Sequence, residues 1–233
     1  ASDTDVRTGK LYDYFKRSWQ YALSKDALAA FKPFVVGEAG MNDGAQHPRG
    51  NHNIDTIYYG IFMADYAVQA VNAGSAAVLA WMLDDNSHLG FFWGLWTNKE
   101  KGMKLRPWFC PWSLLCRSFT PGSKIIRTNP ISKDVRVLAA YCDHKDTSGI
   151  QSWSFCLVNQ ANKATTVRLH VPAGPHLIMR RYVYSKTSIK TDANGFPAPL
   201  DNRGYDLNKG ADVPCEANSI VILTSIEAAH TAN

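Results

Sequence analysis

Glu38 is the residue whose setting most suggests chemistry, because it follows the apolar run 34–36 and has Gly37 and Gly40 close by. Three successive apolar residues are typical of a parallel strand buried on both faces. In parallel sheets the carboxyl ends of the strands carry the catalytic groups, and glycines there let backbone and substrate approach. The chain has only four glutamates, so Glu38 is not part of a solvating charge run. We expect a catalytic carboxylate, with a structural salt bridge as the alternative.

Two helices and a second strand would position this carboxylate. Residues 10–23 carry apolar side chains at spacings of three and four, which predicts an amphipathic helix. A second helix should begin at Asn53 or Asp55, either of which can cap it, and should end at Asn-Ala-Gly, residues 72–74. The all-apolar run 76–83 predicts another buried strand. Strand, loop, helix and strand in this order indicate a βαβ unit with parallel strands.

Two loops and one more helix complete this part of the chain. The polar loop 41–53 has about a dozen residues, a length at which loops are usually functional or disordered. An aromatic loop over residues 91–96 follows the second strand, and residues 107–119 predict a short helix.

The pattern changes near Pro121-Gly122, after which short β-rich runs alternate with turn signals. At least six strands and no helical pattern indicate an antiparallel β-sandwich. The expected strands are 124–127, 135–142, 152–158, 165–171, 177–184 and 219–224. The domain boundary is therefore expected at about residue 120, giving domains 1–120 and 121–233.

Composition narrows the class of protein. Of the 233 residues, 45% are hydrophobic and 12% aromatic, which indicates an ordered globular chain. The net charge of +5 is dispersed, with its nearest approach to a cluster at Lys99–Arg106, so we do not expect nucleic acid as a partner. The five cysteines form no CxxC pair and have no histidine at metal spacing, so no metal is expected and most should be buried small hydrophobes. No apolar run is long enough to predict a membrane span.

The segments Val36-Gly37-Glu38-Ala39-Gly40 and Ala80-Trp81-Met82-Leu83-Asp84-Asp85, in this order of elements, resemble the C-terminal half of a retaining glycoside hydrolase. The resemblance is to the (β/α)8-barrel clan A, in particular to cellulase-like, glucosylceramidase-like and xylosidase-like families with a β-sandwich after the barrel. In that clan a nucleophilic glutamate ends the seventh strand and a tryptophan commonly ends the eighth. The resemblance implies an α/β portion, the last βα units of a TIM barrel, followed by an all-β sandwich.

The resemblance assigns roles to the remaining polar and aromatic residues. Glu38 would be the nucleophile, kept ionised by cations or hydrogen-bond donors that lower its pKa. The loop residues Asn42, His47, Arg49 and His52 could supply them. Trp81 would be a platform for a sugar ring, with a place in the apolar core as the alternative. The other expected substrate contacts are Asn42, Asp84, Asp85, His52, His88, Trp93 and Trp96.

Each of these contacts has a structural alternative. Asp84 and Asp85 could bind sugar hydroxyls or hold loops together. Trp93 and Trp96 could form outer subsites, although aromatic loop residues are more often packing. A lone histidine such as His52 or His88 is usually a satisfied polar group.

The chain also departs from the clan. Retaining hydrolysis needs a second carboxylate roughly 5 Å from the nucleophile, and the clan carries it after an asparagine on the fourth strand. This sequence has no Asn-Glu pair. A quarter of a barrel would leave open sheet edges. We therefore expect a C-terminal fragment or processed subunit, whose partner carboxylate comes from an upstream segment or another chain.

The leading hypothesis is a glycosidase that acts on a β-linked glycan, needs no cofactor and works in a secreted, periplasmic or lysosome-like compartment. The alternative is a non-catalytic carbohydrate-binding or structural β-sandwich module attached to a vestigial barrel piece. An esterase of the α/β-hydrolase type is disfavoured, because the chain has no Gly-x-Ser-x-Gly elbow.

Overall fold

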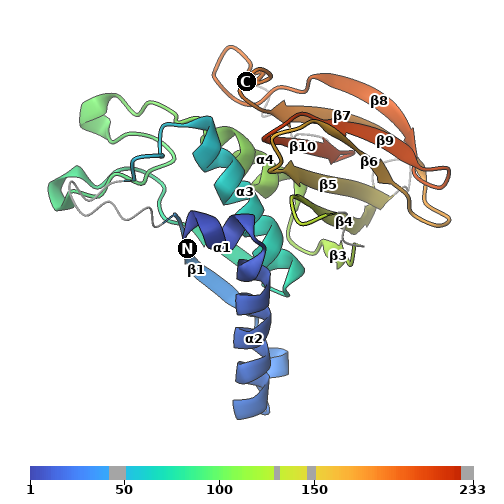
Figure 1. Cartoon of the computed structure of the whole chain (residues 1–233), viewed down its shortest axis with the longest axis horizontal. Coiled ribbons are helices and arrows are strands. Elements are labelled where there is room, and N and C mark those ends of the chain that lie inside the picture. Colours follow the sequence, from blue (N-terminus) through green and yellow to red (C-terminus); the bar gives the residue numbers. More distant parts are fainter. Residues whose placement is uncertain (42–50, 129–131, 146–150, 227–233) are drawn as a thin grey trace. The chain divides into compact units, whose positions relative to one another are not determined.

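A computed structural model describes residues 1–41, 51–128, 132–145 and 151–226, with the backbone alone at residues 143–145. The chain divides into two compact units, Ala1–Trp112 and Ser113–Asn233 (Figure 1). This division passes through a helix, α4 (Phe109–Ser118), whereas the boundary expected from the sequence lies just beyond the end of that helix.

The first unit is built on three helices. The predicted amphipathic helix is present as α2 (Lys10–Lys25), and a short helix that the sequence analysis did not predict, α1 (Asp3–Arg7), precedes it. The third, α3 (Ile57–Asn72), begins later than expected, because the Thr56 side chain accepts a hydrogen bond from the Tyr59 N–H and acts as the cap. The predicted caps Asn53 and Asp55 were therefore wrong, whereas the predicted end at residues 72–74 is confirmed.

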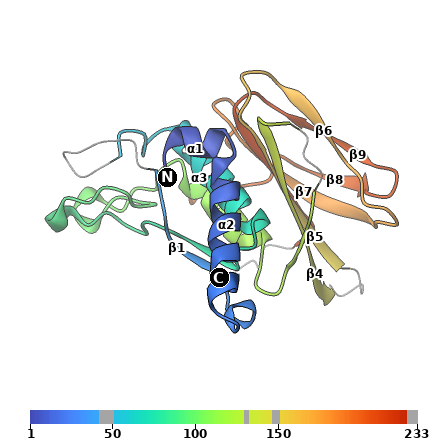
Figure 2. The same cartoon turned by 60° about the horizontal axis from the view of Figure 1, so that its bottom comes forward.

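Helix α3 is buried around most of its circumference, not along one stripe. Its Gln69 side chain donates to the Val6 carbonyl at 2.7 Å and accepts from the Tyr12 N–H at 3.1 Å, which joins the three helices (Figure 2). Gln69 also donates to the fully buried Asp65 carboxylate at 3.0 Å. Buried polar groups of this kind need partners, and here they hold α1 and α2 against α3.

The predicted parallel βαβ unit is confirmed. Strand β1 (Val35–Ala39) pairs in parallel with β2 (Ala77–Ala80), and α3 is the crossover between them. Among the described residues these two strands form a sheet by themselves. The prediction that both strands are buried on both faces was wrong for this chain, because Val35 is 43% and Leu79 54% exposed. A sheet face is buried only where helices or a second sheet pack on it, and these two side chains are not covered in that way.

The chain between β2 and α4 makes a long excursion. It contains two single-turn 3-10 helices, η2 (Ser87–Leu89) and η3 (Lys99–Lys101), and isolated bridges that pair its outgoing and returning arms. We call residues 81–96 the aromatic loop. The excursion ends at α4, which confirms the helix predicted for residues 107–119.

The second unit contains two antiparallel sheets. The six-stranded sheet has the order β3-β4-β5-β10-β7-β8, and β6 pairs with β9 in a separate sheet (Figure 2). The strands are β3 (Lys124–Ile126), β4 (Val135–Lys145), β5 (Gln151–Asn159), β6 (Thr165–Leu169), β7 (His176–Tyr184), β8 (Asp201–Asp206), β9 (Ala211–Cys215) and β10 (Ser219–Thr224). All six strands expected from the sequence are present. The two missed strands, β8 and β9, have weak signals, because β8 is polar with an internal glycine and β9 contains a proline.

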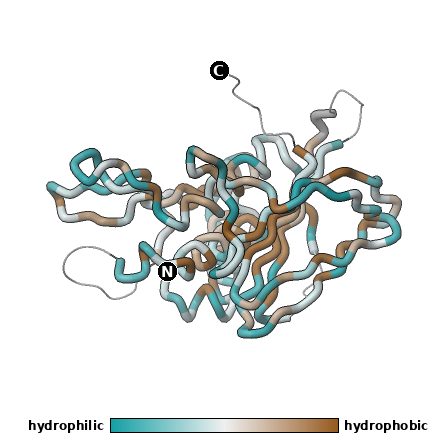
Figure 3. Tube along the Cα trace, turned by 90° about the horizontal axis from the view of Figure 1, so that it is seen from above, coloured by the Kyte–Doolittle hydropathy of each residue, from teal (hydrophilic) through white to brown (hydrophobic). Residues whose placement is uncertain are grey.

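Side chains of both sheets meet in one hydrophobic cluster. Its members come from β4, β5, β7, β8 and β10 and from the pair β6 and β9, with Leu157, Val213 and Leu223 fully buried. Strand β10, inside the six-stranded sheet, is buried along its whole length, and hydrophobic stretches of the chain are drawn in brown in Figure 3. The five cysteines are free, and four of them are buried, as expected of small hydrophobes; Cys116 on α4 is exposed. Within the described residues, each helix is too short or too polar to cross a membrane.

The shared cluster predicts where the second unit is sensitive to mutation. Leu157→Ala should lower the free energy of unfolding by about 2–5 kcal/mol, because it leaves a cavity between strands that cannot collapse. Ile178→Ala, on the same sheet but 66% exposed, should change it by less than about 0.5 kcal/mol. Denaturant titration of both variants measures the difference. Equal effects would contradict a single core between the sheets.

Candidate active site

The position of Glu38 depends on an irregularity in β1. The chain advances three residues from Val36 to Ala39 while β2 advances two, from Val78 to Ala80, so one extra residue is inserted as a β-bulge. Regular alternation would place Glu38 on the same face as the buried Val36. The extra residue instead leaves Glu38 exposed and buries Ala39. Bulges often redirect side chains next to active sites.

Trp81 directly follows the end of the neighbouring strand. Its backbone N–H donates to the Ala39 carbonyl at 2.9 Å, which extends the parallel pairing by one residue. Gly40 packs against the Trp81 carbonyl, where a Cβ would come within 3.6 Å. Trp81 is 37% exposed, so the alternative of a buried core position does not hold in this chain. The carboxyl ends of two parallel strands thus present a carboxylate and an indole together.

The polar loop after β1 is described only in part. Asn42, His47 and Arg49 lie outside the described residues, and the roles expected for them stay predictions. His52 is exposed at the end of that loop. With the residues that the structure describes, the Glu38 carboxylate forms no ion pair or hydrogen bond, so the structural salt bridge considered from the sequence is not seen there.

The aromatic residues divide into two groups. The rings of Trp81 and Phe91 meet at 6.4 Å between centroids and an interplanar angle of 86°, and Phe91 meets Trp93 at 5.6 Å. Trp96 instead packs against Phe109 of α4, with centroids 6.5 Å apart. The structure therefore connects Trp93 to the Trp81 platform through Phe91, whereas Trp96 contacts the helix that follows.

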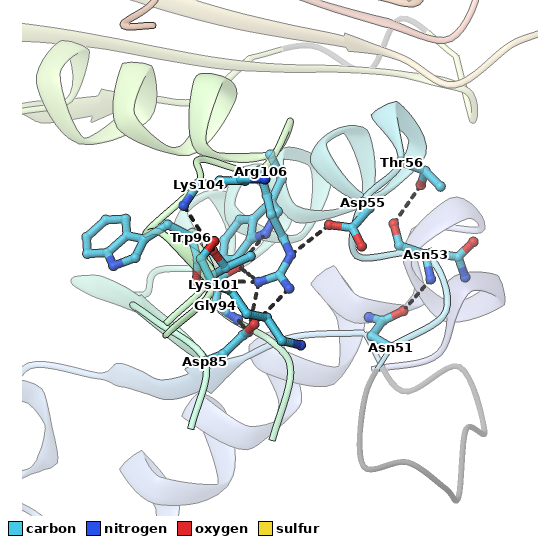
Figure 4. Close-up of polar contacts among 12 residues, drawn as sticks. Asn51, Asn53, Asp55, Thr56, Asp85, Gly94, Trp96, Lys101, Lys104 and Arg106 are labelled. Carbon is cyan, nitrogen blue, oxygen red and sulfur yellow. Dashed lines mark hydrogen bonds and ion pairs between the residues drawn. The ribbon is translucent and has the colours of Figure 1, made fainter. Parts of the chain in front are cut away.

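A buried ion pair holds the base of the aromatic loop. Arg106 donates to both carboxylate oxygens of Asp85, at 2.8 and 2.9 Å, and a third donor, Nε, reaches Asp55 at 2.8 Å (Figure 4). The Arg106 and Asp85 side chains are almost wholly buried, whereas Asp55 is exposed. Burial by itself lowers the pKa of Arg106, but the hydrogen bonds and charges of Asp85 and Asp55 outweigh it, and the pKa is raised. The guanidinium therefore stays charged inside the protein.

Gly94 completes this arrangement. Its N–H donates to Asp85 at 2.9 Å, and its carbonyl accepts from Arg106 at 2.9 Å and from the Trp108 indole at 3.1 Å (Figure 4). A Cβ at this position would lie 2.3 Å from the Trp96 carbonyl oxygen, so no other residue fits without moving the backbone. Asp85 is thus occupied in holding loops, the structural role that the sequence left open for it.

Two further residues predicted to contact the substrate, Asp84 and His88, are exposed. Asp84 is exposed and forms an isolated bridge with Trp96 through the backbone. His88 is exposed within η2. Neither is brought to Trp81 by a contact among the described residues, so their roles toward a substrate stay predictions.

Sequence reasoning missed three residues of this region, Arg106, Gly94 and Phe91. Arg106 was counted with a dispersed basic run, although it is internal and paired. A signal was present: an Asp-Asp pair after a strand and an isolated arginine before Pro107 and Trp108 suggest a paired interior charge. Phe91 gave no such signal, because an aromatic loop contains several equivalent candidates.

Removing the arginine tests the ion pair. Arg106→Met should lower the free energy of unfolding by about 3–5 kcal/mol, because Asp85 would remain buried without its counter-charge. The same change in an exposed pair, Arg168→Met opposite Asp212, should cost less than about 1 kcal/mol. Thermal and denaturant unfolding compare the two variants, and a small loss at Arg106 would show that the loop does not depend on this pair.

Gly94 gives an independent test of the same loop. Gly94→Ala should be strongly destabilising, by more than about 2 kcal/mol, since its methyl group would overlap backbone atoms of Trp96 and Asp85. Gly37→Ala is the matched control, because a Cβ there meets no atom within 4 Å. If both variants unfold alike, the close approach at Gly94 is not a constraint.

No family model matches the chain, and no curated protein matches its sequence. Solved structures do match. The GH30 endoxylanase from Clostridium papyrosolvens C71 aligns over 85% of this chain and 43% of its own, with 15% identity and a TM-score of 0.59. The GH30 subfamily 8 xylanase Xyn30A from Clostridium acetobutylicum aligns over 84% and 43%, with 13% identity and a TM-score of 0.61.

A third match is the α-L-arabinofuranosidase from Thermotoga maritima, which aligns over 94% of this chain and 48% of its own, with 14% identity and a TM-score of 0.60. The chain spans less than half the length of these proteins. At such identities the likeness is one of fold. In fold, this chain resembles a portion of the clan A barrel glycoside hydrolases, as its sequence predicts.

Proposed function

We propose that this chain is the C-terminal portion of a retaining glycoside hydrolase that cleaves a β-linked glycan, with Glu38 as the nucleophile. The observation that carries the proposal is the exposed Glu38 carboxylate at the bulge in β1, next in the chain to Ala39, whose carbonyl accepts from the N–H of Trp81 at the end of the neighbouring parallel strand. The similarity in fold to GH30 and GH51-type hydrolases supports the same class of reaction.

The chemistry follows from these two groups. Glu38 attacks the anomeric carbon of a sugar stacked on Trp81, while a second carboxylic acid protonates the departing glycosidic oxygen. The glycosyl–Glu38 ester is then hydrolysed by a water molecule, which the same second group, now a carboxylate, deprotonates. The anomeric centre is inverted twice, so its configuration is retained.

The second carboxylate belongs to a part of the barrel outside this chain. The solved structures that resemble this chain are more than twice as long as the aligned segment, which supports an upstream segment or another chain as its source. In this proposal β1 and β2 are barrel strands seven and eight, α4 is the eighth helix, and the two antiparallel sheets of the second unit form a β-sandwich. A secreted, periplasmic or lysosome-like compartment is proposed with it.

Replacing the nucleophile tests the proposal. In the complete protein that carries this chain, Glu38→Gln should reduce kcat on a p-nitrophenyl β-xyloside or β-glucoside by about 10⁴-fold, as for other covalent catalysts. Glu100→Gln is the matched control, since Glu100 is also exposed but lies in η3. Thermal unfolding of both variants should match the unaltered protein.

Chemical rescue separates a nucleophile from any other essential role. Glu38→Ala with added azide should yield a glycosyl azide of inverted configuration, because azide enters from the face that the carboxylate occupied. A Glu38→Gln variant that keeps more than about a tenth of the activity would reject the proposal. Glycan binding by residues 113–233 that is unchanged by substitutions at Glu38 and Trp81 would favour the binding-module alternative.

A further inference from the structure

An aromatic ring contact constrains the plane of the Trp81 indole. The indole is 37% exposed and comes directly after the last residue of β2. Within the described residues, the aromatic ring in contact with it is Phe91, at 6.4 Å and 86°. Perpendicular aromatic pairs at this distance are favourable beyond the area they bury. The orientation of the platform therefore depends on where Phe91 is held.

Phe91 is held by the backbone on both sides. Its N–H donates to the Asn86 carbonyl at 3.0 Å, and its carbonyl accepts from the Asn86 N–H at 2.9 Å. The turn between them contains η2 and ends at Gly90, whose φ of +72° lies in the left-handed region that glycine adopts without strain. Two residues on, the Trp93 carbonyl accepts from the N–H of Met82 at 3.1 Å. The arm that carries Phe91 is thus bonded directly to the residue after Trp81.

The segment that carries Phe91 and Trp93 is also anchored by the buried ion pair of Asp85 and Arg106. Gly94, next to Trp93, is bonded to Asp85 through its N–H and to Arg106 through its carbonyl. Phe91 also contacts Trp93 at 5.6 Å, which supports its far side. A continuous set of contacts runs from the protein interior through Trp93 and Phe91 to the indole of Trp81.

We propose that Phe91 is a positioning residue for substrate binding, which fixes the indole plane of Trp81 so that a pyranose ring can stack on it. The inference rests on the proposed glycosidase function. Without the Phe91 ring the indole loses this edge contact and is held less firmly, and the sugar must order it on binding. Because Glu38 is untouched, the effect falls on KM and not on kcat.

Phe91→Ala should raise KM about 2–10-fold on the glycoside that the complete protein hydrolyses, with kcat within twofold, as expected from the strength of one aromatic pair. Phe91→Tyr keeps the ring, so its KM should equal that of the unaltered protein. Phe91→Leu keeps the bulk without the ring and should resemble the alanine variant. Thermal unfolding identifies any variant that acts through loss of fold.

Phe92→Ala is the matched control. Phe92 is the neighbouring aromatic residue, but its ring lies under Lys101, with the Lys101 Nζ 4.6 Å from the ring centroid. Its removal should leave KM unchanged.

A double-mutant cycle decides whether Phe91 acts through Trp81. In a Trp81→Leu background, Phe91→Ala should cause no further rise in KM. If the Trp81→Leu variants cannot be saturated with substrate, kcat/KM is compared instead. An unchanged KM in Phe91→Ala, or the same loss with and without Trp81, overturns the inference but leaves the proposed function standing. If the unaltered protein hydrolyses no glycoside, both the proposed function and the inference about Phe91 are wrong.

Discussion

The buried pair of Asp85 and Arg106 is the interaction on which the chain beyond β2 depends. Two charges withdrawn from water are tolerated only when their hydrogen-bonding capacity is filled. Here both carboxylate oxygens receive a guanidinium N–H, and the Gly94 carbonyl accepts another. Asp85 and Arg106 are 21 residues apart in the sequence, so their pairing holds together the two ends of the loop between them. Gly94, the residue after Trp93, is bonded to both partners of the pair, which ties the aromatic loop to this polar centre.

A second constraint is the parallel direction of β1 and β2. Parallel strands end at the same edge of a sheet, so residues 42 positions apart, Ala39 and Trp81, become hydrogen-bonded neighbours. This is why the ends of β1 and β2, at Glu38 and Trp81, lie at the same edge of the sheet although the sequence separates them. The same sheet has only two strands among the described residues. Its faces are covered incompletely, which explains the exposed aliphatic residues Val35 and Leu79.

Much of the fold could be predicted from local pattern. The βαβ order, α2, α4 and six strands of the second unit follow from periodicity and turn residues. Strand β9 could not be predicted, because pairing with β6 overrides its proline and polar residues. The start of α3 was misplaced because Asn53, Asp55 and Thr56 can each cap a helix, and only the geometry selects Thr56.

The sequence predicted which kinds of residue form the candidate site better than it predicted their contacts. Glu38 and Trp81 stand out from composition and position, whereas Arg106 and Phe91 matter through contacts between arms of one loop. Burial of β1 was overestimated, because an apolar run indicates what a strand can cover and not whether a neighbour is present to cover it.

The bulge in β1 has a consequence for how this segment tolerates change. The direction of Glu38 is set by the difference in length between two intervals, Val36 to Ala39 on β1 and Val78 to Ala80 on β2, and not by the identity of the side chains there. Inserting one residue into β2 between Val78 and Ala80 would make the intervals equal, restore regular pleating and turn the acid to the face that the buried Val36 occupies. A one-residue insertion in the neighbouring strand is therefore expected to displace the acid more than most single substitutions within β1.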